Sequence, residues 1–208
     1  MRTSQVRDFL VNLYMSESKL IEETNGAWKR SSVMLIGPPG VGKTVSGYEA
    51  ALIIAKRLGR TLVEYDDSVA EEVLSNLDKY FVYHFLALPM CERTDISGFP
   101  AVLKNGCVKF FSPLWMTVMQ KCPGMLVLDD FLDVQRPDLF SEMYRLILKY
   151  RFERHSGVMM VMTNAPCSNV TEKWKLEWFK EMCDKIVIME GRIPVKVFDK
   201  HTRCKSTS

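Results

Sequence analysis

Residues 33–44 constrain the fold more than any other stretch of this 208-residue chain. They read VMLIGPPGVGKT, so an apolar run typical of a short buried strand leads directly into the pattern G-x-x-x-x-G-K-[ST] over Gly37–Thr44. The glycines allow the backbone to turn successive N–H groups inward toward an anion. A helix-forming run follows over Ser46–Leu58, and its positive end would point at the same anion. This order of strand, glycine-rich loop and helix predicts a phosphate-binding loop.

The residue types in this loop suit a nucleoside triphosphate and a magnesium ion. Lys43 supplies a cation for the β- and γ-phosphates, and the Thr44 hydroxyl is a ligand type that Mg²⁺ accepts. We therefore expect ATP and Mg²⁺ as cofactors. The residues expected to contact the nucleotide form one continuous run, namely Gly37, Pro38, Pro39, Gly40, Val41, Gly42, Lys43, Thr44 and Val45.

The composition is that of an ordinary globular α/β domain. The chain is 47% apolar and 25% charged, and its net charge of +3 is too small to predict nucleic-acid binding on bulk electrostatics. No segment reaches the length of a membrane span and no secretory signal is evident, so we expect a cytoplasmic protein with no membrane partner.

Six scattered cysteines without a C-x-x-C pair favour reduced thiols. His201 and Cys204 have no second pair at ligand spacing, so we expect no zinc site.

Apolar runs alternate with helical periodicities along the rest of the chain, which predicts a parallel sheet covered on both faces. The fold class expected is therefore α/β, a P-loop NTPase three-layer sandwich around a central five-stranded parallel sheet. Besides the strand at 33–36, the expected strands are 81–88, 125–128, 158–162 and 186–189, with a short return strand at 195–198. Helices are expected at 4–23, 69–77, 113–121, 137–150 and around Trp174 and Trp178.

Three regions follow from this order of elements. We expect a helical leader at 1–30, a P-loop ATPase core at 31–190, and a short strand with a basic tail at 191–208. Within the core, His84 falls in a predicted strand, and we expect it to be a buried histidine whose hydrogen bonds are satisfied.

A β-hairpin insert is predicted by Asn105-Gly106, which separates two strand-like runs within Ala101–Phe111. A two-stranded ribbon cannot bury all of its apolar side chains, which here are Val102, Leu103, Val108 and Phe110. These side chains must pack on the domain, on a neighbouring subunit or on a target. We therefore expect the hairpin to project from the core as an interaction element.

Polar residues end two further strands, and ligands in such sheets bind beyond the carboxyl ends of the strands. Asp129 is placed to hold Mg²⁺ through water, and Asp130 beside it is a candidate base for the attacking water. Asn164 ends the next strand, where its amide would orient that water or sense the γ-phosphate. The alternative for Asn164 is a plain turn at Asn-Ala-Pro.

At this point the sequence resembles the AAA+ ATPases. Gly37–Thr44 is similar to their Walker A motif, Met125–Asp130 to their Walker B motif and Val158–Asn164 to their sensor-1 strand. A narrower resemblance is to the MoxR-like branch, in which an acidic segment like Asp95–Pro100 leads into a hairpin insert. The resemblance covers about residues 30–190. It implies an ATPase that assembles side by side into a homo-oligomer and remodels or loads a complex of protein or nucleic acid.

Three departures from the family pattern qualify this resemblance. Asp129-Asp130 replaces the usual Asp-Glu, as in replication initiators and helicase loaders, and the shorter carboxylate predicts slow hydrolysis. Lys185 stands where the family carries an arginine finger, and it keeps the charge without the planar fork. Arg151 and Arg154 are the other candidates for a cation donated to a neighbour's site. The helical lid that would follow residue 190 is not expected, so the core stands alone.

Three functions remain open at the level of sequence. The first is an ATPase that remodels or loads a macromolecular complex. The second is a slowly hydrolysing nucleotide switch or adaptor of the helicase-loader or initiator type, acting with nucleic acid. The third is a small-molecule P-loop kinase, which the absence of an arginine-rich lid and the presence of Asn164 make less favoured.

Overall fold

The computed structural model describes residues 3–26, 28–152, 157–164, 183–189 and 197–199, with the backbone alone for 148–152 and 197–199. Several predictions fall outside these residues. They are the helix around Trp174 and Trp178, the pair His201 and Cys204, the basic tail from Lys200, and Arg154.

The described residues form a mostly parallel sheet in the order β2-β3-β6-β7-β1-β8-β9. Its strands are β1 (Val33–Ile36), β2 (Thr61–Glu64), β3 (Tyr80–Ala87), β6 (Gly124–Asp129), β7 (Val158–Thr163), β8 (Lys185–Ile188) and β9 (Val197–Asp199). The first six strands in the order are parallel, and β9 runs antiparallel to β8 as the predicted return strand. The α/β architecture is confirmed, and the sheet has one more parallel strand than expected. That strand, β2, is short and only half-buried, so it gives little apolar signal.

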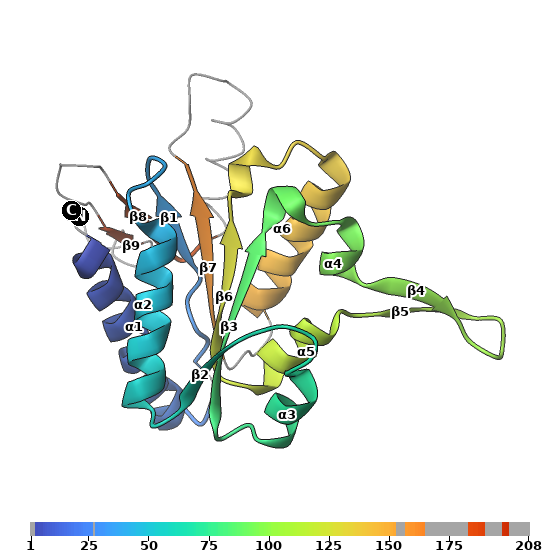
Figure 1. Cartoon of the computed structure of the whole chain (residues 1–208), viewed down its shortest axis with the longest axis horizontal. Helices are drawn as coiled ribbons and strands as arrows, with labels where there is room; N and C mark the ends of the chain where they lie inside the picture. The colour runs from blue at the N-terminus through green and yellow to red at the C-terminus, as the bar shows by residue number, and fades with distance from the viewer. Residues whose placement is uncertain (1–2, 27, 153–156, 165–182, 190–196, 200–208) are drawn as a thin grey trace, which may run out of the picture.

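Helices cover both faces of this sheet and complete a three-layer sandwich (Figure 1). One face carries α1 (Thr3–Glu23) and α2 (Lys43–Arg57), and the other carries α3 (Ala70–Ser75), α5 (Leu114–Lys121) and α6 (Pro137–Phe152). Alternate strand residues supply the two cores. Val33 and Leu35 pack with the α1 and α2 side chains, whereas Met34 and Ile36 pack into the cluster on the opposite face.

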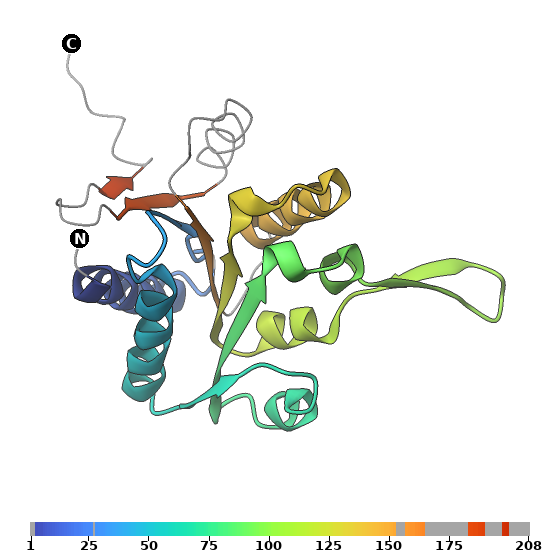
Figure 2. The same ribbon diagram turned by 45° about the horizontal axis from the view of Figure 1, so that its top comes forward.

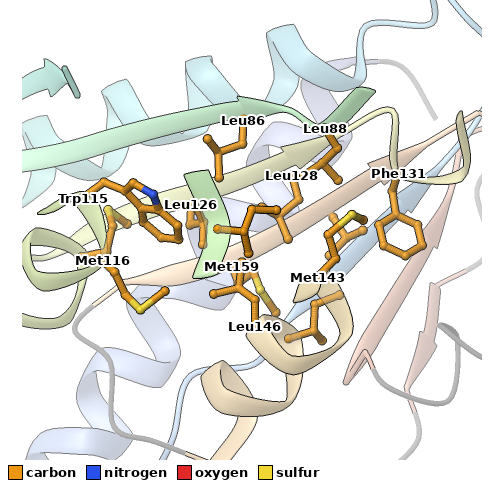
Figure 3. Packing of buried hydrophobic residues seen from close by; sticks show 14 of the residues in the cluster. Leu86, Leu88, Trp115, Met116, Leu126, Leu128, Phe131, Met143, Leu146 and Met159 are labelled. Atoms are coloured by element: carbon orange, nitrogen blue, oxygen red, sulfur yellow. The ribbon is translucent and has the colours of Figure 1, made fainter. Parts of the chain in front are cut away.

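The core beneath α5 and α6 is rich in large flexible side chains. Trp115 and Met116 of α5 and Met143 and Leu146 of α6 point toward strand residues such as Leu126 (Figure 3). Leu126 is fully buried, as are Leu128 and Met159 on the neighbouring strand positions. This packing fixes the carboxyl end of β6, where Asp129 begins the acidic segment.

The helix predicted for 4–23 is present as α1, and it packs into the same core as β1 and α2. Val6, Leu10, Val11 and Tyr14 on one of its faces are buried in that cluster. Its first turn lies against Gly42 and the start of α2, because the Ser46 hydroxyl donates to the Thr3 carbonyl at 3.3 Å and a Cβ on Gly42 would lie 2.8 Å from the Thr3 hydroxyl. The amino end of α1 therefore packs beside the last residue of the loop.

The predicted hairpin is confirmed and lies between α4 (Arg93–Ser97) and α5. Its strands, β4 (Phe99–Val102) and β5 (Val108–Phe111), pair antiparallel and extend away from the sheet (Figure 2). Val102, Val108 and Phe110 are each more than 60% exposed, so the described residues do not cover the apolar side chains of the ribbon.

Four described cysteines, Cys91, Cys107, Cys122 and Cys183, carry thiols rather than disulfides. None of the described helices has the length and apolar character needed to cross a bilayer.

Candidate nucleotide-binding site

A pocket of about 400 Å³ opens at the carboxyl ends of β1, β6 and β7. Its lining residues are Pro39, Gly40, Gly42, Lys43, Thr44, Val45, Asp129, Asp130 and Asn164. All of them were predicted as site residues from the sequence. The structure thus brings the loop, the two carboxylates and the amide together around one cavity, although they are separated by more than one hundred residues in the chain.

Three predicted loop residues, Gly37, Pro38 and Val41, do not line the pocket. Gly37 instead joins the loop to the sheet, because its N–H donates to the Thr163 carbonyl at 3.2 Å. A Cβ at this position would lie 2.5 Å from the Met189 carbonyl oxygen, so a larger residue would push the loop away from the strand ends. The carbonyls of Gly37 and Pro38 still reach the site as acceptors for Lys43.

The turn into α2 requires glycine at two positions. Gly40 and Gly42 have φ angles of 74° and 89°, in the left-handed region that side chains disfavour. Gly42 is the residue immediately before α2, and a Cβ there would lie 2.8 Å from the Thr3 hydroxyl. The helix predicted to begin near Gly42 does begin there, so its amino end faces the pocket.

The Lys43 side chain is buried, with 7% of its surface exposed, and its ammonium has three oxygen acceptors. It donates to the carbonyls of Gly37 at 2.7 Å and Pro38 at 3.1 Å and to the Asn164 amide oxygen at 3.1 Å. Burial lowers the pKa of Lys43, while the charges of Asp129 and Asp130 oppose that shift. These three acceptors occupy all three donors of the ammonium, so a phosphate that binds Lys43 would replace one of them.

Thr44 and Asp129 bring two oxygen donors together, since the Thr44 hydroxyl donates to Asp129 Oδ2 at 3.3 Å. The other Asp129 oxygen accepts the Asp130 N–H at 2.9 Å. Burial is the main cause that raises the pKa of Asp129, and the neighbouring Asp130 charge adds to it. A hydroxyl and a carboxylate are the ligand types that Mg²⁺ takes beside phosphates and water. These two residues therefore fit the ion, although no group of three potential metal-binding side chains occurs within the described ranges.

Asn164 links the cationic and acidic sides of the pocket. While its oxygen accepts from Lys43, its NH₂ group lies 3.5 Å from Asp130 Oδ1 and donates to Asp133 Oδ2 at 3.1 Å. Asp130 itself is in the left-handed conformation, with φ 52°, and initiates the short 3₁₀ helix η2 (Phe131–Asp133). That helix turns the chain back so that a third carboxylate reaches Asn164.

Sequence reasoning missed Asp133. The signal available was the spacing D-D-x-x-D, in which one turn of helix returns the third carboxylate to the side of the first two. An apolar residue pair separates them, and without a structure it reads as the start of the next core segment.

Comparison with known proteins gives only distant similarities to solved structures. No protein-family model matches the sequence, and no curated protein matches it. Among solved structures, a chain of the HORMA:CdnC:Trip13 complex of E. coli MS115-1 matches with a TM-score of 0.40 and 15% identity, covering 90% of this chain and 57% of that one. A KaiC-like protein from Pyrococcus horikoshii OT3 matches with a TM-score of 0.43 and 14% identity, covering 86% of this chain and 82% of that one. The Aeropyrum pernix ORC1 protein, solved with DNA, matches with a TM-score of 0.41 and 13% identity, covering 86% of this chain and 44% of that one.

The present chain thus spans little more than half of the first of these proteins and less than half of the last. At such identities and TM-scores the likeness carries no conclusion about this chain. The strand order, the loop between β1 and α2 and the pocket at the strand ends decide the architecture. The chain has a P-loop NTPase fold.

In this P-loop NTPase fold Lys185, one of the three candidate cations for a neighbour's site, lies at the strand end opposite the pocket. Lys185 is the first residue of β8 and pairs with Val33 at the start of β1, whereas the phosphate loop follows Ile36. Three residues of strand separate the two ends by about 10 Å. Arg151 lies in the last turn of α6, where only the backbone is described.

Proposed function

We propose that this protein binds ATP with Mg²⁺ and hydrolyses it as an AAA+-type ATPase, using the cycle to remodel or load a macromolecular complex. The observation that carries the proposal is the convergence of Lys43, Asp129 and Asn164, from three separate strand ends, on one pocket. The buried ammonium, the paired oxygen donors and the bridging amide are the groups that phosphoryl transfer requires, because that reaction depends on positioning and on charge stabilisation.

Each residue has a role in this proposal. Lys43 binds the terminal phosphates, and Thr44 and Asp129 hold Mg²⁺, which supplies charge stabilisation to the phosphates when it is bound. Asp130 accepts the proton of the attacking water. Asn164 orients that water, and it is positioned for this by its contacts with Lys43 and Asp133.

Phosphate release from ATP without any added acceptor tests the proposal and separates an ATPase from a kinase. We expect Mg²⁺-dependent release by the parent protein, loss of ATP binding in Lys43→Ala, and binding without efficient turnover in Asp130→Asn. Lys56→Ala is a matched control, because Lys56 is an exposed lysine at the other end of α2. If Lys43→Ala binds ATP as tightly as the parent does, the assignment of the pocket is wrong.

A second function, a slowly hydrolysing switch that acts with nucleic acid, is favoured by one specific observation. The carboxylate proposed as base is an aspartate, and its backbone is fixed in the left-handed conformation by the turn into η2. Its reach is therefore shorter than that of a glutamate at the same place. Single-turnover hydrolysis with and without single-stranded DNA distinguishes the two functions, since a switch retains ATP through many minutes and a motor does not.

The proposed remodelling activity also needs partners, and homo-oligomers that complete each other's ATP sites are the arrangement we propose. The hairpin supports a contact with a target or neighbour, because its apolar side chains lie exposed along β4 and β5. Replacing 101–111 with a short Gly-Ser link should leave folding and ATP binding intact and abolish partner-dependent activity. Loss of the fold in that variant would contradict the assignment of the hairpin as an interaction element.

A further inference from the structure

A second cavity, of about 540 Å³, lies at the base of the hairpin and shares no lining residue with the nucleotide pocket. It lies on the face of the sheet that carries α3 and α5. Four aromatic side chains contribute to its wall, namely Tyr65, Phe99, Phe111 and Trp115. Three carboxylates, Asp66, Asp67 and Asp95, also line it. We refer to these seven residues and His84 as the hairpin-base pocket.

His84 lines this pocket and is more than nine-tenths buried, with 8% of its surface exposed. Neither ring nitrogen has a hydrogen-bond partner among the described residues, so the expectation of a satisfied core histidine was wrong. The imidazole lies between the rings of Tyr65 and Trp115, with centroid separations of 4.7 and 5.1 Å. Burial lowers its pKa to about 4, so the ring is neutral at pH 7 and presents one nitrogen as an acceptor. Both ring nitrogens lie beneath the pocket surface, and a buried polar side chain without a partner is costly.

The remaining lining groups favour a cation. Aromatic ring faces attract cations, and the Lys109 ammonium already lies 5.4 Å from the centroid of the Phe111 ring. Among the described residues that line this pocket, none is a lysine or an arginine. Asp67 accepts the Tyr65 hydroxyl at 2.7 Å and Asp95 accepts the Glu92 N–H at 2.8 Å, each through one oxygen. A carboxylate has a second oxygen, so both groups retain capacity to accept from a ligand.

The walls of the pocket are held in place by contacts at the root of the hairpin. The Trp115 indole N–H donates to the Asp95 carbonyl at 2.8 Å and ties α5 to α4. Gly98 has a φ of 81°, and a Cβ on it would lie 1.9 Å from the Phe111 carbonyl oxygen, so the two hairpin strands meet closely here. Phe99 and Phe111 are directly paired across β4 and β5, which places both rings on the pocket side.

We propose that the hairpin-base pocket receives an arginine side chain of a partner polypeptide. A guanidinium stacks on aromatic rings and offers five N–H donors, which suits the aromatic walls and the carboxylates together. A nucleic acid does not fit this lining, because three carboxylates without a cation repel phosphates. The exposed apolar side chains of the adjoining hairpin extend the surface over which the partner chain lies.

The probe for this proposal is the peptide acetyl-Gly-Arg-Gly-amide, compared with the same peptide carrying citrulline, which is similar in shape and uncharged. Binding is followed through the Trp115 indole N–H signal by NMR, in the absence of nucleotide. We expect a saturable shift with the arginine peptide and affinity at least about tenfold weaker for the citrulline peptide. Equal affinity for the two peptides, no saturable shift, or tighter binding of uridine monophosphate than of the arginine peptide would each overturn the proposal.

Two matched pairs of variants locate the binding. Phe111→Ala should weaken the arginine peptide about tenfold, whereas Phe110→Ala, next to it on the opposite face of β5, should not. Asp67→Asn, which keeps an acceptor for Tyr65, should weaken binding, and Asp78→Asn outside the pocket should not. Equal affinities within either pair, in variants with parental melting curves, contradict the assignment. Lys43→Ala should bind the peptide normally, so failure of the proposed ATPase function and failure of this inference give different results.

Discussion

The amide oxygen of Asn164 accepts a hydrogen bond from the Lys43 ammonium at 3.1 Å. Because the same side chain donates to Asp133, a change of partner at the cation is transmitted to the acidic segment. Under the proposed ATPase function, Asn164 would respond to a phosphate that binds Lys43.

We predict that Asn164→Ala lowers the rate of ATP hydrolysis by about a hundredfold, the usual effect of removing one oriented polar group from a reacting centre. The equilibrium for ATP binding should change much less, since Lys43 keeps its other acceptors. Calorimetric binding and single-turnover phosphate release measure the two effects separately. Asn76→Ala, at the end of α3, is the control. A parental turnover rate in Asn164→Ala would favour the plain turn.

Asp130 and Asp133 should differ in their effect on turnover. Asp130→Asn keeps a residue that tolerates the left-handed conformation, so the fold should persist while hydrolysis falls by about a hundredfold or more. Asp133→Asn should cost less than about tenfold, because Asp133 acts through Asn164. Equal losses in the two variants would place the base elsewhere. Asp130→Glu tests reach: if the short carboxylate limits the rate, the longer one accelerates it.

Gly98 and Gly106 both have positive φ angles in the hairpin segment, but only Gly98 is crowded. Gly98→Ala should lower the free energy of unfolding by more than about 2 kcal/mol or release the hairpin, because its Cβ would overlap the Phe111 carbonyl. Gly106→Ala at the tip, where no described atom lies within 4 Å of the added Cβ, should cost about 1 kcal/mol. Urea denaturation and limited proteolysis of the hairpin compare the two. Equal effects would mean that conformation alone, rather than close packing at the root, sets the cost.

The low pKa of His84 predicts a loss of stability in mild acid. The unfolded chain binds a proton on His84 below about pH 6.5 and the folded protein only below about pH 4, so this contribution is complete above 6.5 and is lost as the pH falls toward 4. The loss should reach about 3 kcal/mol. His84→Leu removes the titrating group, and the difference between the two pH profiles of unfolding free energy isolates it. Parallel profiles would show that His84 keeps an ordinary pKa.

Assembly should make hydrolysis depend on protein concentration. If a neighbour supplies a cation to the transferring phosphate, turnover per subunit rises as dilute protein is concentrated. Lys185→Ala and Arg151→Ala identify the donor, because an inactive donor variant mixed with inactive Asp130→Asn should regain partial activity in mixed interfaces. A flat specific activity, with no self-association in a non-hydrolysable ATP analogue, would favour the switch function.

The features of this structure that could be predicted are those that depend on short sequence motifs. The glycine spacing of residues 37–44 and the polar residues after two apolar runs were sufficient to predict the pocket residues. The reason is that the carboxyl ends of parallel strands meet at one edge of the sheet. Asn105-Gly106 was sufficient for the hairpin. These signals each depend on a few neighbouring residues.

The features that were missed depend on contacts between distant segments. Strand β2 is held by pairing with β3 and has little apolar signal of its own. Asp133 joins the site only because η2 turns it toward Asn164. The His84 ring lacks hydrogen-bond partners among the described residues because Tyr65 and Trp115, which come from different elements, cover it. No sequence window contains these relationships.

The contact between Thr3 and the phosphate loop has a mechanical consequence. The first turn of α1 buttresses Gly42, and the Ser46 hydroxyl donates to both the Thr3 and the Gly42 carbonyls, at 3.3 and 2.7 Å. Tension applied to the amino end of α1, by a fused domain, a tether or a bound partner, would therefore act first on Gly42, the residue that precedes α2 and lines the pocket. A pull on the first turn of α1 would thus change the position of the loop that lines the pocket.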